Sequence, residues 1–391
     1  MSWVLRIAFT IVFFTGLAIF AAEVEVQFNS SFDDSPQTAL AFIPDNLPEN
    51  EKRPLLVIAH PMGGNRYTGQ KSGYHAEAAK RNWLVITPQL HGKNTPGETS
   101  CAALEAQHDI IDAVNYMKLN YPVDDSRIYL VGRSMGGMMT RIMMAKYPDV
   151  FAAGVAGQSA DASHPDKLNN WVRSTLEQEC GDDPWEYARR SAVNFARNLA
   201  YVPLIMWHGT NDGLVSPEFS QELYEAVKVY EPRIMPVFYL VGNTHLTPNV
   251  SPEWECTQLE PYQLTSDSFY QQPIRFYPAL NLVTDESKTI FYFDLQMTEN
   301  DEFAYIESSL APADGEFDSA PSFSGSNQQS KADVIMTLKT RNLKEITINM
   351  DLIPEALRPA SFILDALDAP PCLKIKQNNT ISEAENVAIA D

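Results

Sequence analysis

Short apolar runs alternate with amphipathic stretches along residues 24–250 of the chain. Such runs, rich in β-branched residues, are typical of buried strands. They are Leu55–Ala59, Trp83–Thr87, Arg127–Val131, Ala153–Gln158, Pro203–Trp207 and Met235–Leu240. Between them, Leu104, Ile111, Val114 and Met117 recur at helical spacing, and Pro217–Val229 is a second amphipathic stretch, with Ser216 expected as its N-cap. Strands that alternate with helices predict a mostly parallel α/β sheet with helices on both faces.

Two segments before this pattern are interpreted as antiparallel strands. Val24, Val26 and Phe28 alternate with polar residues, and Thr38–Ile43 follows the turn-like sequence Asp33–Pro36. Alternation of this kind is typical of a strand that is buried on one face only. We therefore expect an antiparallel pair that leads into the sheet.

The segment between Gln158 and Pro203 is about forty residues long, which exceeds an ordinary crossover between strands. It contains Trp171, Cys180 and Trp185 and a helical stretch around Tyr187–Leu199. We interpret this insertion as a small lid.

The pattern changes after about Pro278, where short strand-like runs follow one another without long helices. These runs are Thr289–Gln296, Val334–Leu338, Ile346–Met350 and Leu373–Lys376, and they predict an all-β accessory domain. Ala311–Lys331 is expected to be a loop or a disordered insertion, and the polar tail beyond Gln377 is expected to fray. The predicted organisation is a signal peptide at 1–22, an α/β catalytic domain at 23–277 and a β-rich domain with a polar tail at 278–391.

The N-terminal segment is apolar from Ile7 to Ala22, directly after Arg6. This length suits the hydrophobic region of a signal peptide and is short for a membrane span. We expect the protein to be exported, either secreted or periplasmic. An uncleaved membrane anchor remains the alternative.

The charge balance bears on the choice of partners. Of the 391 residues, 29 are basic and 50 are acidic, which gives a formal net charge of -21. Such a charge repels phosphate backbones and anionic membrane surfaces, so neither nucleic acid nor, after signal cleavage, a membrane is an expected partner. The charge does not indicate a substrate, because solubility alone is enough to explain it. The sequence leaves the oligomeric state open.

Four cysteines are present, namely Cys101, Cys180, Cys256 and Cys372. In an exported chain this even number predicts one or two disulfides, and three pairings of all four are possible. Because no two cysteines form a CxxC, the sequence argues against a zinc site and a redox dithiol.

The strongest chemical signal is a G-x-S-x-G motif at residues 132–136, with Ser134 at its centre. The motif directly follows the expected strand Arg127–Val131 and precedes an expected helix from about Gly137 to Lys146. A sharp strand-to-helix turn exposes a serine hydroxyl above the sheet, and the helix N-terminus favours developing negative charge. Ser134 is therefore the predicted nucleophile.

The base and the acid follow from their order along the chain. In this arrangement the acid follows the serine and the histidine follows the acid. Asp212 comes directly after the expected strand Pro203–Trp207, and of the seven histidines only His245 lies beyond it. We expect His245 to be the general base and Asp212 its orienting carboxylate, with Asp161 as the fallback acid.

The oxyanion of an acyl-transfer reaction needs two N–H donors. The N–H of Met135, directly after the serine, is the first expected donor. The second is expected from the segment His60–Gly64, which follows the strand Leu55–Ala59. We assign it to the N–H of Met62.

Taken together, the His-Pro-x-Gly-Gly segment at 60–64, Asp125–Gly137, His208–Asp212 and the late His245 resemble the esterase and prolyl-oligopeptidase-like branch of the α/β-hydrolases. This branch includes feruloyl esterases and polyhydroxybutyrate depolymerases. The Ser-Met-Gly-Gly turn at 134–137 is also similar to that of cutinase-like polyester hydrolases, which implies an oxyanion role for the methionine N–H. The resemblance covers about residues 24–250 and departs from the family at Pro61, where a glycine is more usual.

The expected function is hydrolysis of carboxylic esters through an acyl-enzyme and without a cofactor. Aromatic esters and polyesters are among the candidate substrates. A prolyl-oligopeptidase-like peptidase is the first alternative, since the same side chains can cleave amides. It is less favoured because the propeller domain usual in those peptidases has no room here. The second alternative is a catalytically idle protein that binds a polymer through its C-terminal domain.

Overall fold

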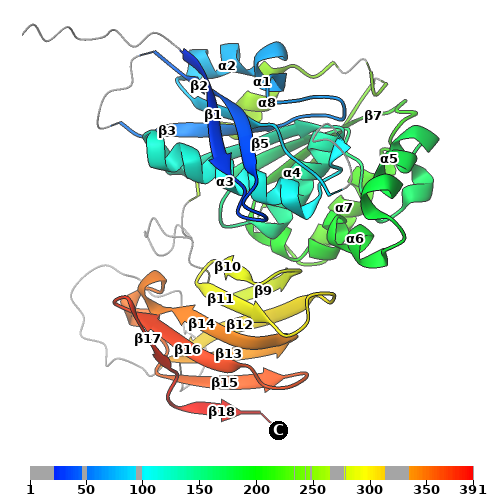
Figure 1. Ribbon diagram of the computed structural model, residues 1–391. Helices are drawn as coiled ribbons and strands as arrows, with labels where there is room; N and C mark the ends of the chain where they lie inside the picture. The colour runs from blue at the N-terminus through cyan, green and yellow to red at the C-terminus, as the bar shows by residue number, and fades with distance from the viewer. Residues whose placement is uncertain are drawn as a thin grey trace, which may run out of the picture.

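The computed structural model describes residues 22–45, 51–93, 99–232, 234–242, 244–246, 249–264, 277, 279–312 and 334–390. Residues 1–21 of the predicted signal peptide and residues 313–331 of the predicted loop lie outside these ranges. The described chain forms an α/β body and, below it in Figure 1, a C-terminal body built of strands. No helix in the described ranges is long and apolar enough to cross a membrane.

The α/β body is built on one sheet of eight strands in the order β1-β2-β4-β3-β5-β6-β7-β8. The strands are β1 (Ala22–Asn29), β2 (Pro36–Ile43), β3 (Arg53–Ala59), β4 (Leu84–Pro88), β5 (Val123–Arg133), β6 (Ala153–Gly157), β7 (Leu204–Gly209) and β8 (Val237–Val241). β1 and β2 pair antiparallel and β2 joins β4 antiparallel, whereas the other neighbours are parallel. The predicted antiparallel pair and the parallel sheet are both confirmed.

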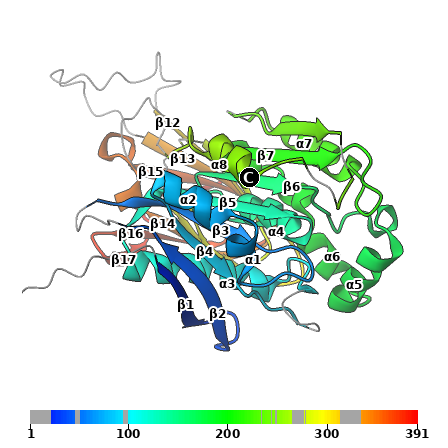
Figure 2. The same cartoon turned by 90° about the horizontal axis from the view of Figure 1, so that it is seen from above.

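Helices cover both faces of this sheet. α1 (Thr68–Lys71), α2 (Tyr74–Arg81) and α8 (Pro252–Leu259) lie over one face, as Figure 2 shows from above. α3 (Leu104–Asn120), α4 (Met135–Lys146) and α7 (Glu218–Lys228) pack on the other face. Every residue of α4 is buried, because the sheet covers it on one side and the lid segment and the C-terminal body cover it on the other. The predicted Ser216 cap differs slightly: Pro217 is the N-cap, while the Ser216 hydroxyl accepts from the Glu218 N–H.

The insertion between β6 and β7 is helical, as expected. It contains α5 (Asn170–Cys180), α6 (Pro184–Arg189) and the 3-10 turns η3 (Ala192–Phe195) and η4 (Asn198–Tyr201). Its first part is joined to the loop after β7, since Leu168 pairs with Val215 and the Asn169 N–H donates to the Leu214 carbonyl. The α5 end of the insertion is therefore fastened beside the loop that carries Asp212.

The C-terminal body is a pair of five-stranded sheets, which confirms the all-β prediction. One sheet has the order β10 (Lys288–Ile290), β11 (Phe293–Met297), β14 (Leu343–Asn349), β16 (Cys372–Gln377) and β17 (Thr380–Glu383). The other has the order β18 (Val387–Ile389), β15 (Ser361–Ala366), β13 (Val334–Arg341), β12 (Ala304–Pro312) and β9 (Ala279–Thr284). The apolar faces of both sheets share one core. We refer to this body as the β-sandwich.

Two sequence-based expectations for this body are wrong. The tail beyond Gln377 does not fray, because β17 pairs with β16 and β18 pairs with β15. The run Thr289–Gln296 is two strands rather than one, since the chain turns at Phe291, whose φ is 53°.

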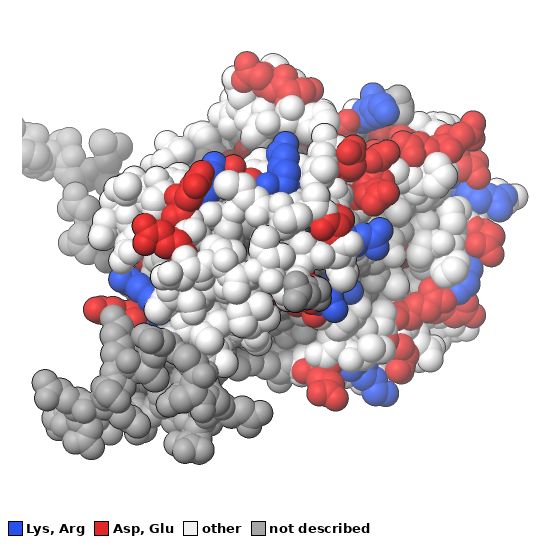
Figure 3. All heavy atoms as spheres, turned by 90° about the horizontal axis from the view of Figure 1, so that it is seen from below, with Lys and Arg blue, Asp and Glu red and all other residues white. Residues whose placement is uncertain are grey.

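Acidic side chains cover more of the lower face of the molecule than basic ones do (Figure 3), in keeping with the net charge of -21.

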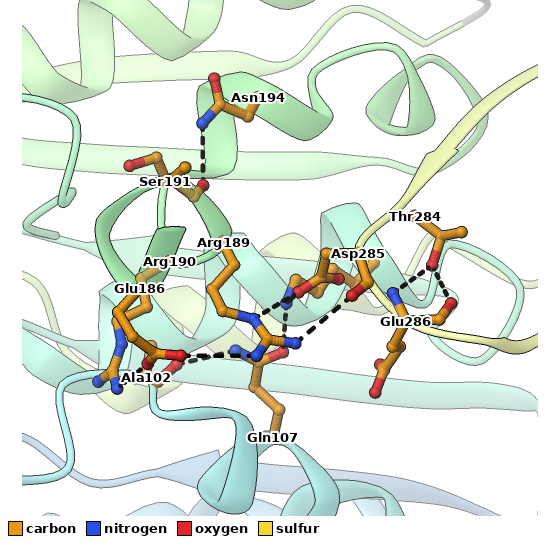
Figure 4. Close-up of polar contacts among 12 residues, drawn as sticks. Ala102, Gln107, Glu186, Arg189, Arg190, Ser191, Asn194, Thr284, Asp285 and Glu286 are labelled. Atoms are coloured by element: carbon orange, nitrogen blue, oxygen red, sulfur yellow. Dashed lines mark hydrogen bonds and ion pairs between the residues drawn. The ribbon is translucent and has the colours of Figure 1, made fainter. Parts of the chain in front are cut away.

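The β-sandwich is attached to the helices through buried charges. The carboxylate of Asp285, after β9, lies 2.7 Å from Lys146 Nζ in α4 and 3.0 Å from Arg189 Nε in α6. Figure 4 shows Arg189 pointing at Asp285. Burial lowers the pKa of Lys146 to about 8, although Asp285 opposes this shift. Phe303 of the β-sandwich also packs on Phe195 of the lid, so the junction has an apolar part as well.

The four cysteines lie in the described residues, and each is a free thiol. Cys101, Cys180 and Cys256 are buried, whereas Cys372 is exposed. Burial raises the pKa of each of the three buried thiols to about 12. The disulfides expected from the sequence are thus not formed in the structure.

Candidate active site

Ser134 stands at the turn between β5 and α4, in a strained backbone conformation with φ 56° and ψ -121°. The glycines around it allow this turn. A Cβ at Gly136 would lie 2.1 Å from the carbonyl oxygen of Ala59, and one at Gly132 would lie 2.2 Å from that of Gly136. Since no side chain fits at either position, the motif brings the end of β3, the end of β5 and the start of α4 into direct contact.

His245 lies in the connection between β8 and α8, outside any helix or strand. Its Nε2 is 2.9 Å from Ser134 Oγ, and its Nδ1 is 2.7 Å from Asp212 Oδ2. The structure therefore brings together the three side chains that the sequence singled out, 111 and 33 residues apart along the chain. With Nδ1–H donated to the carboxylate, Nε2 can accept the proton of the serine hydroxyl.

The side chain of Asp212 is buried, and donors surround its carboxylate. Oδ1 accepts from the N–H groups of Leu214 and Val215, at 3.0 and 2.9 Å. Burial by itself would raise the pKa of Asp212, but the hydrogen bonds from His208, His245 and Val215 outweigh it and hold the pKa well below its usual range. The carboxylate is therefore ionised and fixed in place at neutral pH.

His208 is a second histidine beside Asp212 that the sequence reasoning did not assign. Its Nε2 lies 3.0 Å from the Val215 carbonyl oxygen and 3.3 Å from Asp212 Oδ2, and its Nδ1 lies 3.0 Å from Ser220 Oγ. Because both groups near Nε2 are acceptors, Nε2 carries the proton and Nδ1 accepts from the serine. His208 is the penultimate residue of the buried strand β7, four residues before Asp212, and no spacing rule in the sequence marks it.

Asp161, the fallback acid, is engaged elsewhere. Its Oδ1 accepts from the Ser163 N–H at 2.9 Å, and its Oδ2 accepts from the Ala192 N–H at 3.0 Å. Oδ2 also lies 3.4 Å from Arg141, and both side chains are buried. Asp161 thus fastens the lid to α4, whereas Asp212 is the carboxylate that contacts His245.

The two expected oxyanion donors follow adjacent strands, Met62 after β3 and Met135 after β5. β3 pairs with β5 up to Ala59 and Gly132, so the segment 60–64 that carries Met62 begins beside the turn of Ser134. Met135 is buried at the start of α4, where backbone N–H groups have no partner within the helix. Met62 packs against the same apolar core as Met135. Their N–H groups remain predicted oxyanion donors.

We expect the contribution of Asp212 to stability to disappear in acid. A carboxyl group whose pKa is lower in the folded than in the unfolded chain stabilises the fold fully above the unfolded value of about 3.9, and this stabilisation is lost as the pH falls from that value through the lower pKa of the folded state. Asp212→Asn, which removes the charge, is expected to lower the free energy of unfolding by about 1–3 kcal/mol at neutral pH. Thermal unfolding of both proteins from pH 7 to about pH 2 should show a constant gap down to about pH 4 and a narrower gap below it; a gap that is as wide at pH 2 as at pH 7 would contradict the assignment.

The arrangement of sheet, helices and strand-to-helix serine turn is that of an α/β-hydrolase. Among solved structures, a puromycin-hydrolyzing peptidase of Mycobacterium tuberculosis aligns over 62% of this chain and 38% of its own, with a TM-score of 0.52 and 20% sequence identity. At that identity the similarity concerns the fold. Residues 78–246, which include Ser134, Asp212 and His245, match the prolyl oligopeptidase family.

Curated relatives share more of the sequence. An acetylxylan esterase of Coprinopsis cinerea is 34% identical over 46% of this chain and 52% of its own. Feruloyl esterase B of Talaromyces stipitatus is 28% identical over 50% and 58%, and poly(3-hydroxyalkanoate) depolymerase C of Paucimonas lemoignei is 28% identical over 51% and 50%. The resemblance to the esterase and prolyl-oligopeptidase-like branch of the α/β-hydrolases is thus confirmed. The chain spans about half the length of the curated relatives it matches.

Proposed function

We propose that the protein is a serine hydrolase that cleaves carboxylic esters, with Ser134, His245 and Asp212 as its catalytic residues. The observation that carries this proposal is the chain of hydrogen bonds from the Ser134 hydroxyl through His245 to the buried Asp212 carboxylate, at 2.9 and 2.7 Å. A serine hydroxyl is a weak nucleophile, and a neutral imidazole at this distance is the base that it requires.

The reaction proceeds in two steps. Ser134 Oγ attacks the ester carbonyl while His245 Nε2 takes its proton, and the imidazolium then protonates the leaving alcohol. In the second step His245 deprotonates a water molecule that attacks the acyl-enzyme, and the imidazolium then returns the proton to Ser134 Oγ as the acid leaves. Asp212 holds the tautomer of His245 and stabilises the imidazolium. The N–H groups of Met62 and Met135 are the proposed donors to the oxyanion in both steps.

Ester substrates are favoured because the curated relatives named above are esterases and a polyester depolymerase. We therefore propose acetylated or feruloylated carbohydrates and polyesters as the substrate classes to test first. Hydrolysis of short, long-chain, aromatic and polymeric esters should be compared with hydrolysis of a peptide anilide. A protein that cleaves the anilide and none of the esters would be a peptidase, as the family match over residues 78–246 also allows.

A fluorophosphonate probe separates an enzyme from an idle binding protein. We expect the probe to label the purified protein with one equivalent, and peptide mapping to place the label on Ser134. The matched control is Ser126, which lies on the same strand and hydrogen-bonds to Asp124; Ser126→Ala should leave the labelling unchanged. Absence of any label would favour the binding protein.

Export of the protein is a separate proposal, supported by the apolar run from Ile7 to Ala22. Edman sequencing of the secreted protein tests this proposal, because a cleaved signal peptide would place the new N-terminus close to Ala22.

A further inference from the structure

Gln158 joins three segments that meet at the proposed active site. It follows β6 and is only 2% exposed. Its side-chain amide donates to the carbonyl oxygen of Thr244, the residue directly before His245, at 2.9 Å. Its own N–H donates to the carbonyl oxygen of Trp207 in β7 at 2.8 Å.

The residue before it is tied to the nucleophile. The N–H of Ser134 donates to the carbonyl oxygen of Gly157 at 2.8 Å. A Cβ at Gly157 would lie 2.3 Å from the ring of Trp207, so only glycine fits under this tryptophan. Residues 157 and 158 therefore connect the Ser134 backbone on one side with the His245 loop on the other.

The backbone of Gln158 is held in the left-handed region, with φ 46°. This region is unfavourable for a residue with a Cβ and is retained where the surroundings enforce it. Here the conformation accompanies a buried amide group that reaches across to Thr244. The carbonyl oxygen of Thr244 uses the donor of this buried amide.

The later part of the loop that carries His245 is bonded to β5, the strand that ends directly before Ser134. Arg133, directly before Ser134, donates to the Val250 carbonyl oxygen at 3.0 Å and to the buried carboxylate of Glu255 at 2.7 Å. Glu255 also accepts from Trp207 Nε1 at 2.9 Å. The loop with His245 is thus fixed at both ends to the strands that carry or adjoin the nucleophile.

We propose that Gln158 is a positioning residue for the reaction, holding the Thr244 carbonyl so that the imidazole of His245 meets the Ser134 hydroxyl. This inference rests on the proposed function and concerns the same site. A displacement of a reacting group by about 1 Å can cost a hundredfold in rate, so a side chain that fixes the base affects turnover without touching the substrate.

The test replaces the amide by a side chain of similar length that cannot donate. Gln158→Met is expected to lower kcat for a p-nitrophenyl ester about 10- to 100-fold and to change KM less than twofold. Gln37→Met is the matched control, because Gln37 in β2 is another largely buried glutamine, and its amide donates to the hydroxyl of Ser35, away from the site. It should leave kcat unchanged. If Gln158→Met does not fold, Gln158→Leu, which also cannot donate to the Thr244 carbonyl, gives the same comparison.

A role through His245 also predicts loss of additivity. In a His245→Ala background, Gln158→Met should change the residual rate less than twofold, because the group that it positions is absent. An equal loss in both backgrounds, or no loss in kcat for the single variant, overturns the proposal. The proposed function itself fails if Ser134→Ala and His245→Ala keep the wild-type rate, an outcome distinct from a failure at Gln158 alone.

Discussion

Ser134→Ala is expected to lower kcat for ester hydrolysis by roughly 10⁴- to 10⁶-fold, the loss typical of removing a nucleophile from a serine hydrolase. The reason is geometric, since His245 Nε2 then has no hydroxyl within reach at the 2.9 Å position. The fold should be unaffected, because Ala accepts the same backbone conformation as Ser and the Ser134 N–H still donates to Gly157. Initial rates with a p-nitrophenyl ester, together with thermal unfolding, measure both expectations.

A serine near the site but outside the hydrogen-bond chain provides the control. Ser159 lies beside Arg141, two residues after β6, and its hydroxyl accepts from that arginine at 3.2 Å. Ser159→Ala should keep kcat within a few-fold of the wild-type value. If Ser134→Ala hydrolyses the ester as fast as the wild type, the proposed function is wrong.

Asp285→Asn is expected to cost about 3–5 kcal/mol of the free energy of unfolding. Lys146 and Asp285 are both fully buried, so removal of the carboxylate charge leaves an uncompensated ammonium group in the interior. The buried charge is removed only if the Lys146 side chain loses its proton. At pH 7 that costs about 1.4 kcal/mol for each unit below its unfolded pKa of about 10.4, or about 5 kcal/mol. Chemical denaturation at pH 7 measures the change.

An exposed ion pair of the β-sandwich is the control for the effect of burial on the Asp285→Asn prediction. Arg341 and Glu302 lie 3.7 Å apart, and both are more than half exposed, at 53% and 60%. Glu302→Gln should change the free energy of unfolding by less than about 0.5 kcal/mol. Equal effects at the two sites would mean that the junction of Asp285 does not hold the two bodies together.

The sequence predicted the eight-stranded sheet well because its inner strands β3, β4, β6 and β7 are buried on both faces and therefore appear as continuous apolar runs, while β1 shows the alternation of a strand that is buried on one face. The β-sandwich was harder. Val387–Ile389 is a short strand within a polar tail, and only its parallel pairing with β15 makes it a strand. The turn at Phe291 was missed because the segment contains no glycine, proline or asparagine to mark it.

The candidate site could likewise be predicted from the sequence only in part. Ser134 lies in a local motif, and chain order pointed to Asp212 and His245, so these residues could be selected without coordinates. The parts played by His208 and Gln158 arise from contacts to Asp212 and Thr244 that only the folded chain creates. A histidine after a strand and a glutamine before a loop carry no spacing rule that would mark them in the sequence.

Asp285 receives hydrogen bonds from two helices of the α/β body, one of which begins directly after Ser134. The C-terminal strands therefore cannot be removed without disturbing the helices of the α/β body. Anyone who shortens this protein to a minimal enzyme, or grafts a foreign binding module in place of these strands, must first supply a new counter-ion for Lys146 or replace that lysine by an apolar residue.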